Sequence, residues 1–245
     1  MTFQPRQDPA DALQPLTDLA SRSDVLIFGE VHGTQEVPQL VTGLMKELKR
    51  LGYWGLALEI PSDQRSGLVN WAKGKEPNPP PFFTQPSPDG RGNRQVLECV
   101  QDAVRRGWEI LCFDVEPGQP SRRWSQRDAN MARNFTGQRD RLCPGRKVVG
   151  ICGNLHSRLS RASGDFADLW PSFAFCLQRL NANEVISTVS VEFHQGQFYN
   201  GGQARPVYGV PIAQAFLQKE KDSGHSLVLH LPTATPATFL ASPRA

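Results

Sequence analysis

The sequence predicts an α/β fold with a mostly parallel central sheet, helices on both faces, and antiparallel strands allowed at the C-terminal end. Segments with helical spacing of apolar residues alternate with short apolar runs, as they do in proteins with parallel sheets. Four of these runs are typical of strands buried on both faces: DVLIFG (24–29), GLALEI (55–60), WEILCFD (108–114) and KVVGIC (147–152).

An amphipathic helix is expected after the first run. Thr34 is a candidate N-cap, Pro38 fits the first turn, and Gly52 is a typical stop. Between them, apolar residues recur at helical spacing: Val37, Leu40, Val41, Leu44, Met45, Leu48 and Leu51. The chain is therefore expected to begin its core with a strand, a loop and a helix.

The following segments continue this alternation. An apolar stripe over 96–104 stops at Gly107, and a second helical stripe covers 124–135. Two later apolar segments, 184–193 and 225–231, are expected to be strands. Their direction is left open by the sequence.

The length of 245 residues fits one large domain, and we expect 1–245 to form a single α/β domain. Within it, 1–22 is expected to be irregular. The segment 74–93 contains six prolines, so it is expected to be a loop that is either disordered or a functional lid. Phe82 and Phe83 favour the lid, although they could equally pin a surface loop.

Composition limits the classes of partner. The chain has 27 basic and 24 acidic residues, a formal charge of +3, which argues against a dedicated nucleic-acid surface. There is no apolar signal segment at the start and no apolar stretch long enough to span a membrane. The five cysteines show no CxxC spacing, so neither disulfides nor a cysteine zinc site is expected. We therefore expect a cytoplasmic protein.

Polar side chains stand at the ends of the first four predicted strands. The carboxyl ends of parallel strands share one edge of a sheet, where ligands bind. Three carboxylates brought together there with two histidines would repel each other as anions unless a cation or a shared proton compensated them. The residues concerned are Glu30 and His32, Glu59, Asp114, and Asn154 with His156.

Two kinds of chemistry satisfy this requirement. In the first, His32, His156, Glu30 and Glu59 supply ligands for a divalent metal such as manganese, zinc or cobalt, with an open position for water. In the second, a histidine made more basic by Glu30 or Glu59 activates water directly. Both lead to hydrolysis.

Other residues are expected to support the site. Asp128 shares the apolar stripe of the 124–135 helix, so it needs a partner, which could be Arg127, Arg123 or a pocket histidine. An anchoring role fits it better than catalysis. Arg158 lies two residues from His156 and is the preferred contact for an anion. The other candidate arginines are Arg65, Arg122, Arg123 and Arg161.

The motifs resemble a known superfamily. GEVH at 29–32 and GNLH at 153–156 are similar to the paired GxxH motifs of the TIKI/TraB, ChaN and erythromycin-esterase-like superfamily. ALEIP, RDANMARN and VVGICGNLH match in order, and the resemblance covers about 25–240. It implies a pocket at one sheet edge that contains His32, Glu59 and His156, then Glu30, and less securely Asp114.

The resemblance does not select one activity, because TIKI proteins are metal-dependent proteases, erythromycin esterases use histidine-activated water, and ChaN proteins bind haem. We expect a metal-dependent or metal-assisted hydrolase of ester or peptide bonds, acting on a small molecule or a peptide. One glutamate would act with the histidines and the other as base, while Asp114 would orient a histidine. The alternative is a module for haem or another planar ligand, with 74–93 and the aromatic residues Tyr53, Trp54 or Trp71 adding contacts. A scaffold without ligand is the third possibility.

Overall fold

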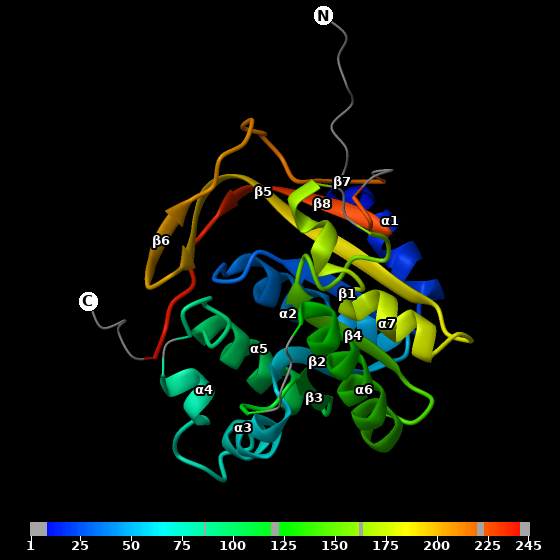
Figure 1. The fold of residues 1–245 in the computed structure, drawn as a ribbon, viewed down its shortest axis with the longest axis vertical. Coiled ribbons are helices and arrows are strands. Elements are labelled where there is room, and N and C mark those ends of the chain that lie inside the picture. Colours follow the sequence, from blue (N-terminus) through cyan, green and yellow to red (C-terminus); the bar gives the residue numbers. More distant parts are fainter. Residues whose placement is uncertain (1–8, 86, 119–122, 162–163, 220–222, 241–245) are drawn as a thin grey trace, which may run out of the picture.

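The computed structural model describes residues 9–85, 87–118, 123–161, 164–219 and 223–240. Its centre is an eight-stranded sheet in the order β3-β2-β4-β1-β5-β8-β7, with β6 paired to β5 (Figure 1). The strands are β1 (Val25–Glu30), β2 (Tyr53–Pro61), β3 (Glu109–Asp114), β4 (Lys147–Gly153), β5 (Ile186–Asn200), β6 (Gln203–Pro206), β7 (Phe216–Gln218) and β8 (Leu227–Ala234).

Strand direction confirms the predicted fold class. The five pairings that involve β1 to β5 and β8 are parallel, whereas β7 pairs with β8 and β6 with β5 in antiparallel fashion. The two later apolar segments, whose direction the sequence left open, thus form the parallel strands β5 and β8. The short strands β6 and β7 supply the antiparallel end.

Helices cover both faces of the sheet. The helical elements are α1 (Pro9–Arg22), α2 (Glu36–Arg50), η1 (Ser62–Gln64), α3 (Arg65–Ala72), α4 (Pro81–Thr84), α5 (Arg94–Arg105), α6 (Trp124–Leu142), η2 (Gly164–Leu169) and α7 (Phe173–Leu180). Residues of α1, α2, α3 and α5 belong to one hydrophobic core, and residues of α6 and α7 belong to the other. Figure 1 shows α6 and α7 side by side, and α2 next to α5.

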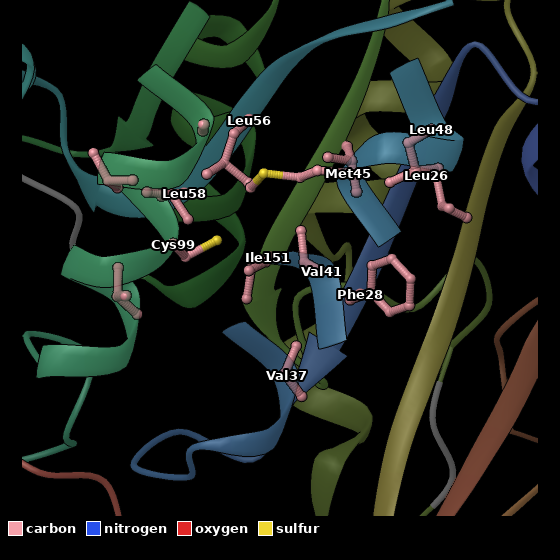
Figure 2. Close-up of a cluster of buried hydrophobic side chains, with 14 of the residues drawn as sticks. Leu26, Phe28, Val37, Val41, Met45, Leu48, Leu56, Leu58, Cys99 and Ile151 are labelled. Carbon is pink, nitrogen blue, oxygen red and sulfur yellow. The ribbon is translucent and has the colours of Figure 1, made fainter. Parts of the chain in front are cut away.

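Alternation along β1 explains why two cores form. Leu26 and Phe28 point to the core under α2, whereas Val25 and Ile27 point to the core under α6 and α7. Figure 2 shows the first core, in which side chains of α2, including Met45, meet those of β1, β2 and β4. Each fully buried side chain of this kind contributes about 1.5–3 kcal/mol to folding. This packing fixes the strands whose ends carry the polar residues.

Two expectations about local structure were wrong. Residues 9–22 are not irregular but form α1, because Leu16, Leu19 and Ala20 are buried on one side of it even though Pro15 lies within the helix. The helix α2 begins after Gln35, and Thr34 does not cap it. The hydroxyl of Thr34 donates instead to the carbonyl of Val31.

The proline-rich segment 74–93 has a defined structure over its described residues. It contains the single-turn helix α4, and Phe83 is fully buried in the core. Within the described residues, no helix is long and apolar enough to cross a membrane.

Candidate active site

The C-terminal ends of four parallel strands bring polar side chains to one edge of the sheet. Glu30 ends β1, Glu59 lies near the end of β2, Asp114 ends β3, and His156 follows β4. All four residues are at most 5 % exposed. The sheet order β3-β2-β4-β1 makes these strand ends neighbours, as the sequence predicted.

The glycines of the two GxxH motifs let the motifs approach each other. A Cβ atom on Gly29 would lie 2.1 Å from Oγ of Ser157, next to the second motif. A Cβ atom on Gly153 would lie 2.8 Å from Nε2 of His32, in the first motif. Each glycine therefore makes room for a residue at the other motif, which gives a physical reason for the paired pattern.

His32 lies between two carboxylates. Its Nδ1 is 2.9 Å from Oε1 of Glu30, and its Nε2 is 3.5 Å from Oε2 of Glu59. Burial alone would lower the pKa of His32, but the charges of Glu59 and Glu30 outweigh it, so the pKa is raised. The side chain remains 19 % exposed, so solvent reaches part of the imidazole ring.

His156 is held on three sides. Its Nδ1 is 2.8 Å from Oδ1 of Asp128, which is fully buried and also accepts the backbone N–H of Phe173. Its Nε2 is 2.8 Å from Nη1 of Arg127, and the indole ring of Trp124 stacks on the imidazole at 4.5 Å. Since arginine can only donate, Nε2 accepts and the proton sits on Nδ1, facing Asp128.

Two guanidinium groups compensate the carboxylates of Glu59 and Asp114. Arg127 donates to Glu59 at 2.7 Å and to Asp114 at 2.8 and 3.0 Å, and Arg91 donates to Glu59 at 3.1 Å and to Asp114 at 2.7 Å. Burial raises the pKa of Glu59, but the positive charges of His32 and both arginines hold it well below its usual value. The backbone N–H of Gly153 also donates to Glu59, at 2.8 Å.

Glu30 has a different environment. Burial raises its pKa, outweighing the hydrogen bond from His32, and its Oε2 atom is buried with no hydrogen-bond partner among the described residues. A cavity of about 10 Å³, the room of one water molecule, lies beside Glu30, Glu59 and Arg91. The pKa values of the two glutamates at this edge are thus shifted in opposite directions.

The sequence did not reveal the two arginines as compensating cations. Arg127 was considered only as a partner for Asp128, which pairs with His156, the pocket histidine that was the other kind of partner expected for it. Arg91 comes from the proline-rich segment, where no periodicity fixes a side chain in space, and it is held there by Asp89 at 2.8 Å. The only signal in the sequence was the excess of acid at the strand ends, which required a cation.

Other predicted supporting residues lie elsewhere or act differently. Asp114 does not orient a histidine but pairs with the two arginines, and Asp128 has the orienting contact instead. Asn154 contributes its backbone to the turn after β4, donating to the carbonyl of Glu30 and accepting from Ser157. The guanidinium group of Arg158 lies against Gly224.

Among the further arginine candidates, Arg65 donates to the carbonyl of Ile110 and to Glu109, and Arg161 donates to the carbonyl of Ala167. Arg123 precedes α6 and is exposed. Arg122 lies outside the described residues. The candidate site is therefore the cluster of His32, His156, the carboxylates around them, Arg91 and Arg127.

The donor set at this edge does not fit a metal centre. Both oxygens of Glu59 and the Nε2 of His156 already accept hydrogen bonds, and the two nearest cationic groups are Arg91 and Arg127. Within the described residues, no group of three His, Cys, Asp or Glu side chains is placed to hold a metal ion. The guanidinium groups supply the positive charge that we had expected from a metal.

Two of the aromatic residues expected to contact a planar ligand, Tyr53 and Trp54, are not at this edge, whereas Phe82 of the 74–93 segment lies next to Arg91. Tyr53 and Trp54 begin β2, at the opposite end of the strand from Glu59. Tyr53 is fully buried, and Trp54 stacks with Lys49. The aromatic ring that does face a pocket histidine is Trp124.

Comparisons with known proteins show similarity of fold. No protein-family model and no curated protein matches the chain. A solved succinoglycan biosynthesis protein is similar with a TM-score of 0.71 and 11 % identity, covering 97 % of this chain and 94 % of that one. A protein from Bacillus cereus is similar with a TM-score of 0.69 and 11 % identity, covering 97 % and 95 %.

A mutant of the erythromycin esterase EreC in its open conformation is similar with a TM-score of 0.67 and 10 % identity, covering 97 % of both chains. At this level of identity the similarity concerns the fold. The chain therefore shares its fold with an erythromycin esterase, as the paired GxxH motifs led us to expect.

Proposed function

We propose that this protein is a hydrolase of ester or peptide bonds in which His32 activates water as a general base, without a metal. The observation that carries the proposal is the position of the His32 imidazole. Its Nδ1 bonds to Glu30, its Nε2 lies 3.5 Å from Oε2 of Glu59, and the side chain is 19 % exposed. A base with this arrangement accepts a proton at Nε2 while the carboxylate stabilises the imidazolium.

The reaction follows from these contacts. Nε2 of His32 takes a proton from a water molecule as its oxygen attacks the carbonyl carbon of the substrate. Arg91 and Arg127, fixed by Glu59 and Asp114, provide positive charge near the oxyanion that develops. The bond to the leaving oxygen or nitrogen then breaks, and the proton on His32 passes to that atom.

The remaining polar residues position these groups. Glu59 is a poor base, because two guanidinium groups and a backbone N–H bind its oxygens. His156 accepts from Arg127 and is fixed by Asp128, so its role is to align Arg127. The similarity in fold to a protein named an esterase agrees with this proposal.

The test is a screen of nitrophenyl esters and fluorogenic peptides with excess chelator present. Activity should persist in chelator, and His32→Gln should reduce it by about 10²–10⁴-fold, the usual contribution of a general base. His194→Gln is the matched control, because His194 lies on β5 and bonds to Val210 and His230 instead of the site. Loss of all activity in chelator, restored by added metal, would contradict the proposal that the reaction needs no metal.

The haem alternative is tested on the same preparations. A binding module would show a shift of the Soret band that disappears in His32→Gln or His156→Gln. We expect no such dependence, because Nε2 of His156 faces Arg127, and Nε2 of His32 lies 3.5 Å from Oε2 of Glu59 and close against Gly153.

A further inference from the structure

A groove of about 340 Å³ runs beside the candidate active site. Its wall is formed by the end of β2, η1, α4, the segment after it, and the loop after β3. The residues that line it are Pro61, Gln64, Pro81, Phe82, Gln85, Ser87, Pro88 and Pro117.

The groove is joined to the active site by direct contacts. The guanidinium group of Arg91 lies 5.8 Å from the ring centre of Phe82. The hydroxyl of Ser87 donates to Asp89, which in turn bonds to Arg91. Because Arg91 bonds to Glu59, a molecule in the groove lies next to the group that polarises the substrate in our mechanism.

The chemistry of the groove selects an uncharged occupant. Within the described part of the chain, no lining side chain carries a charge. Four of the eight lining residues are prolines, which have no backbone N–H to donate. The groove is therefore poor in donors for a carboxylate or phosphate, and its prolines and Phe82 offer apolar contact instead.

Gln64 adds a hydrogen-bond acceptor. Its side-chain nitrogen donates to Asp63 at 2.9 Å, which orients the amide, and its Oε1 atom is buried with no donor among the residues that the structure describes. Leaving such an oxygen unpaired is unfavourable. A modest rotation toward the groove would let it accept an N–H group from an occupant.

The neighbouring surface is suited to binding negatively charged groups. A second groove of about 430 Å³ is lined by Arg65, Arg133 and Arg141 with Glu116 as its one acid. The hydrogen bond from Ser62 to Glu116, of 2.8 Å, joins the segment after β2 to the segment after β3, from which both grooves take lining residues. Anionic groups are attracted to the second groove, which leaves the first to neutral ones.

We infer that the first groove is the substrate subsite for an uncharged, apolar peptide segment. An aliphatic side chain packs against Phe82 and the prolines, and a backbone N–H of the peptide donates to Oε1 of Gln64. This inference rests on the proposed function, because it assigns the groove to the substrate of that reaction. It selects peptides over the esters that the active site alone would allow.

The experiment measures binding in the His32→Gln variant, so that hydrolysis does not interfere. The probe is the neutral tripeptide acetyl-Ala-Leu-Ala-amide, added up to about 10 mM to isotope-labelled protein while backbone amide signals are followed by NMR. Two comparison ligands are used: analogues with each N–H replaced in turn by an ester oxygen, and the tripeptide with Glu in place of Leu.

The inference predicts signal changes at Gln64, Phe82 and Gln85. One ester analogue should bind about 2–10-fold more weakly than the peptide, as expected for one lost hydrogen bond. Gln64→Leu should remove that difference, and Phe82→Ala should weaken binding about 10-fold through lost apolar contact. Gln197→Leu, on the exposed end of β5, is the matched control and should change nothing.

No signal changes in the groove, equal binding of peptide and all ester analogues, or preference for the Glu-containing tripeptide would each overturn the inference. The outcomes separate the two proposals. Binding in the groove without any hydrolysis by the wild type would reject the function and keep the groove. Hydrolysis whose KM is unchanged by Gln64→Leu and Phe82→Ala would reject the groove and keep the function.

Discussion

Replacing Arg127 by Met should destabilise the protein strongly, because Arg127 compensates two buried carboxylates. Its guanidinium group makes four hydrogen bonds, to Glu59, to both oxygens of Asp114 and to His156. The arginine side chain is only 18 % exposed, and those of Glu59 and Asp114 are 4 % and 5 % exposed. Removing one partner of such a buried cluster costs about 3–5 kcal/mol. In a protein of this size, that lowers Tm by roughly 6–20 °C.

The loss should depend on pH in a defined direction. The low pKa of Glu59 in the wild type means that its stabilising charge interactions are present above the unfolded pKa and lost only as pH falls through the folded one. In Arg127→Met the folded pKa of Glu59 rises, so protonation relieves the unpaired charge at mildly acidic pH. The destabilisation should therefore be smaller at pH 5 than at pH 8.

Urea unfolding followed by tryptophan fluorescence measures both effects. Arg133→Met is the matched control on the same helix, since Arg133 is exposed and should change stability by less than about 0.5 kcal/mol. The double variant Arg127→Met/Asp114→Asn should recover part of the loss. A cost below about 1 kcal/mol that is the same at both pH values would refute the assignment of Arg127 as the compensating cation.

Three further predictions concern the histidines. The pKa of His32 is raised in the folded state, so its contribution to stability is fully present below its unfolded pKa and is lost as pH rises through its folded pKa. The difference in unfolding free energy between the wild type and His32→Gln should therefore shrink from pH 5.5 to pH 9 in urea unfolding. A difference that stays constant with pH would contradict this. Asp128→Asn should place its NH₂ against His156, because its oxygen must still accept from a backbone N–H, and the resulting tautomer would point a proton at Arg127. We expect activity to fall about 10²–10⁴-fold with little change in KM, and full activity would show that the tautomer is irrelevant. Gly153→Ala should push the His32 ring away, since the Cβ atom of the alanine would lie 2.8 Å from Nε2 of His32. We expect kcat to fall up to about 10²-fold while Tm changes little. An unchanged kcat would show that the position of the His32 ring against Gly153 is not required.

The fold was predictable because its core strands carry their signal in consecutive residues. A run such as 147–152 is buried on both faces, so nearly every residue is apolar, and burial of β4 matches this pattern. The elements that the sequence did not reveal are short or compositionally ambiguous. β7 has three residues, and α1 itself contains Pro9 and Pro15, so neither gives a periodic signal that outweighs its local composition.

The candidate site was predictable to the extent that strand ends position its residues. Glu30, Glu59 and Asp114 are placed by the sheet, and parallel pairing alone is enough to bring them to one edge. Arg91 could not be found in this way, because it lies in a proline-rich segment whose path depends on tertiary contacts such as the burial of Phe83. The role of Asp114 was misassigned for the same reason, since its partners come from outside the strands.

The different positions of the two glutamates explain why the histidine next to Glu30 is the better base. Glu59 on β2 is reached by guanidinium groups from α6 and from the loop before α5, and its pKa is held low. Glu30 on β1 faces a small cavity lined partly by Leu58, Ile60, Val96 and Ile151, and its pKa is raised by burial. A carboxylate in largely apolar surroundings gains when its partner imidazole becomes positively charged, and His32 is the group that is hydrogen-bonded to Glu30. In the proposed mechanism, the pair formed by Glu30 and His32 therefore takes up the proton, whereas Glu59 stays ionised and fixes Arg91 and Arg127.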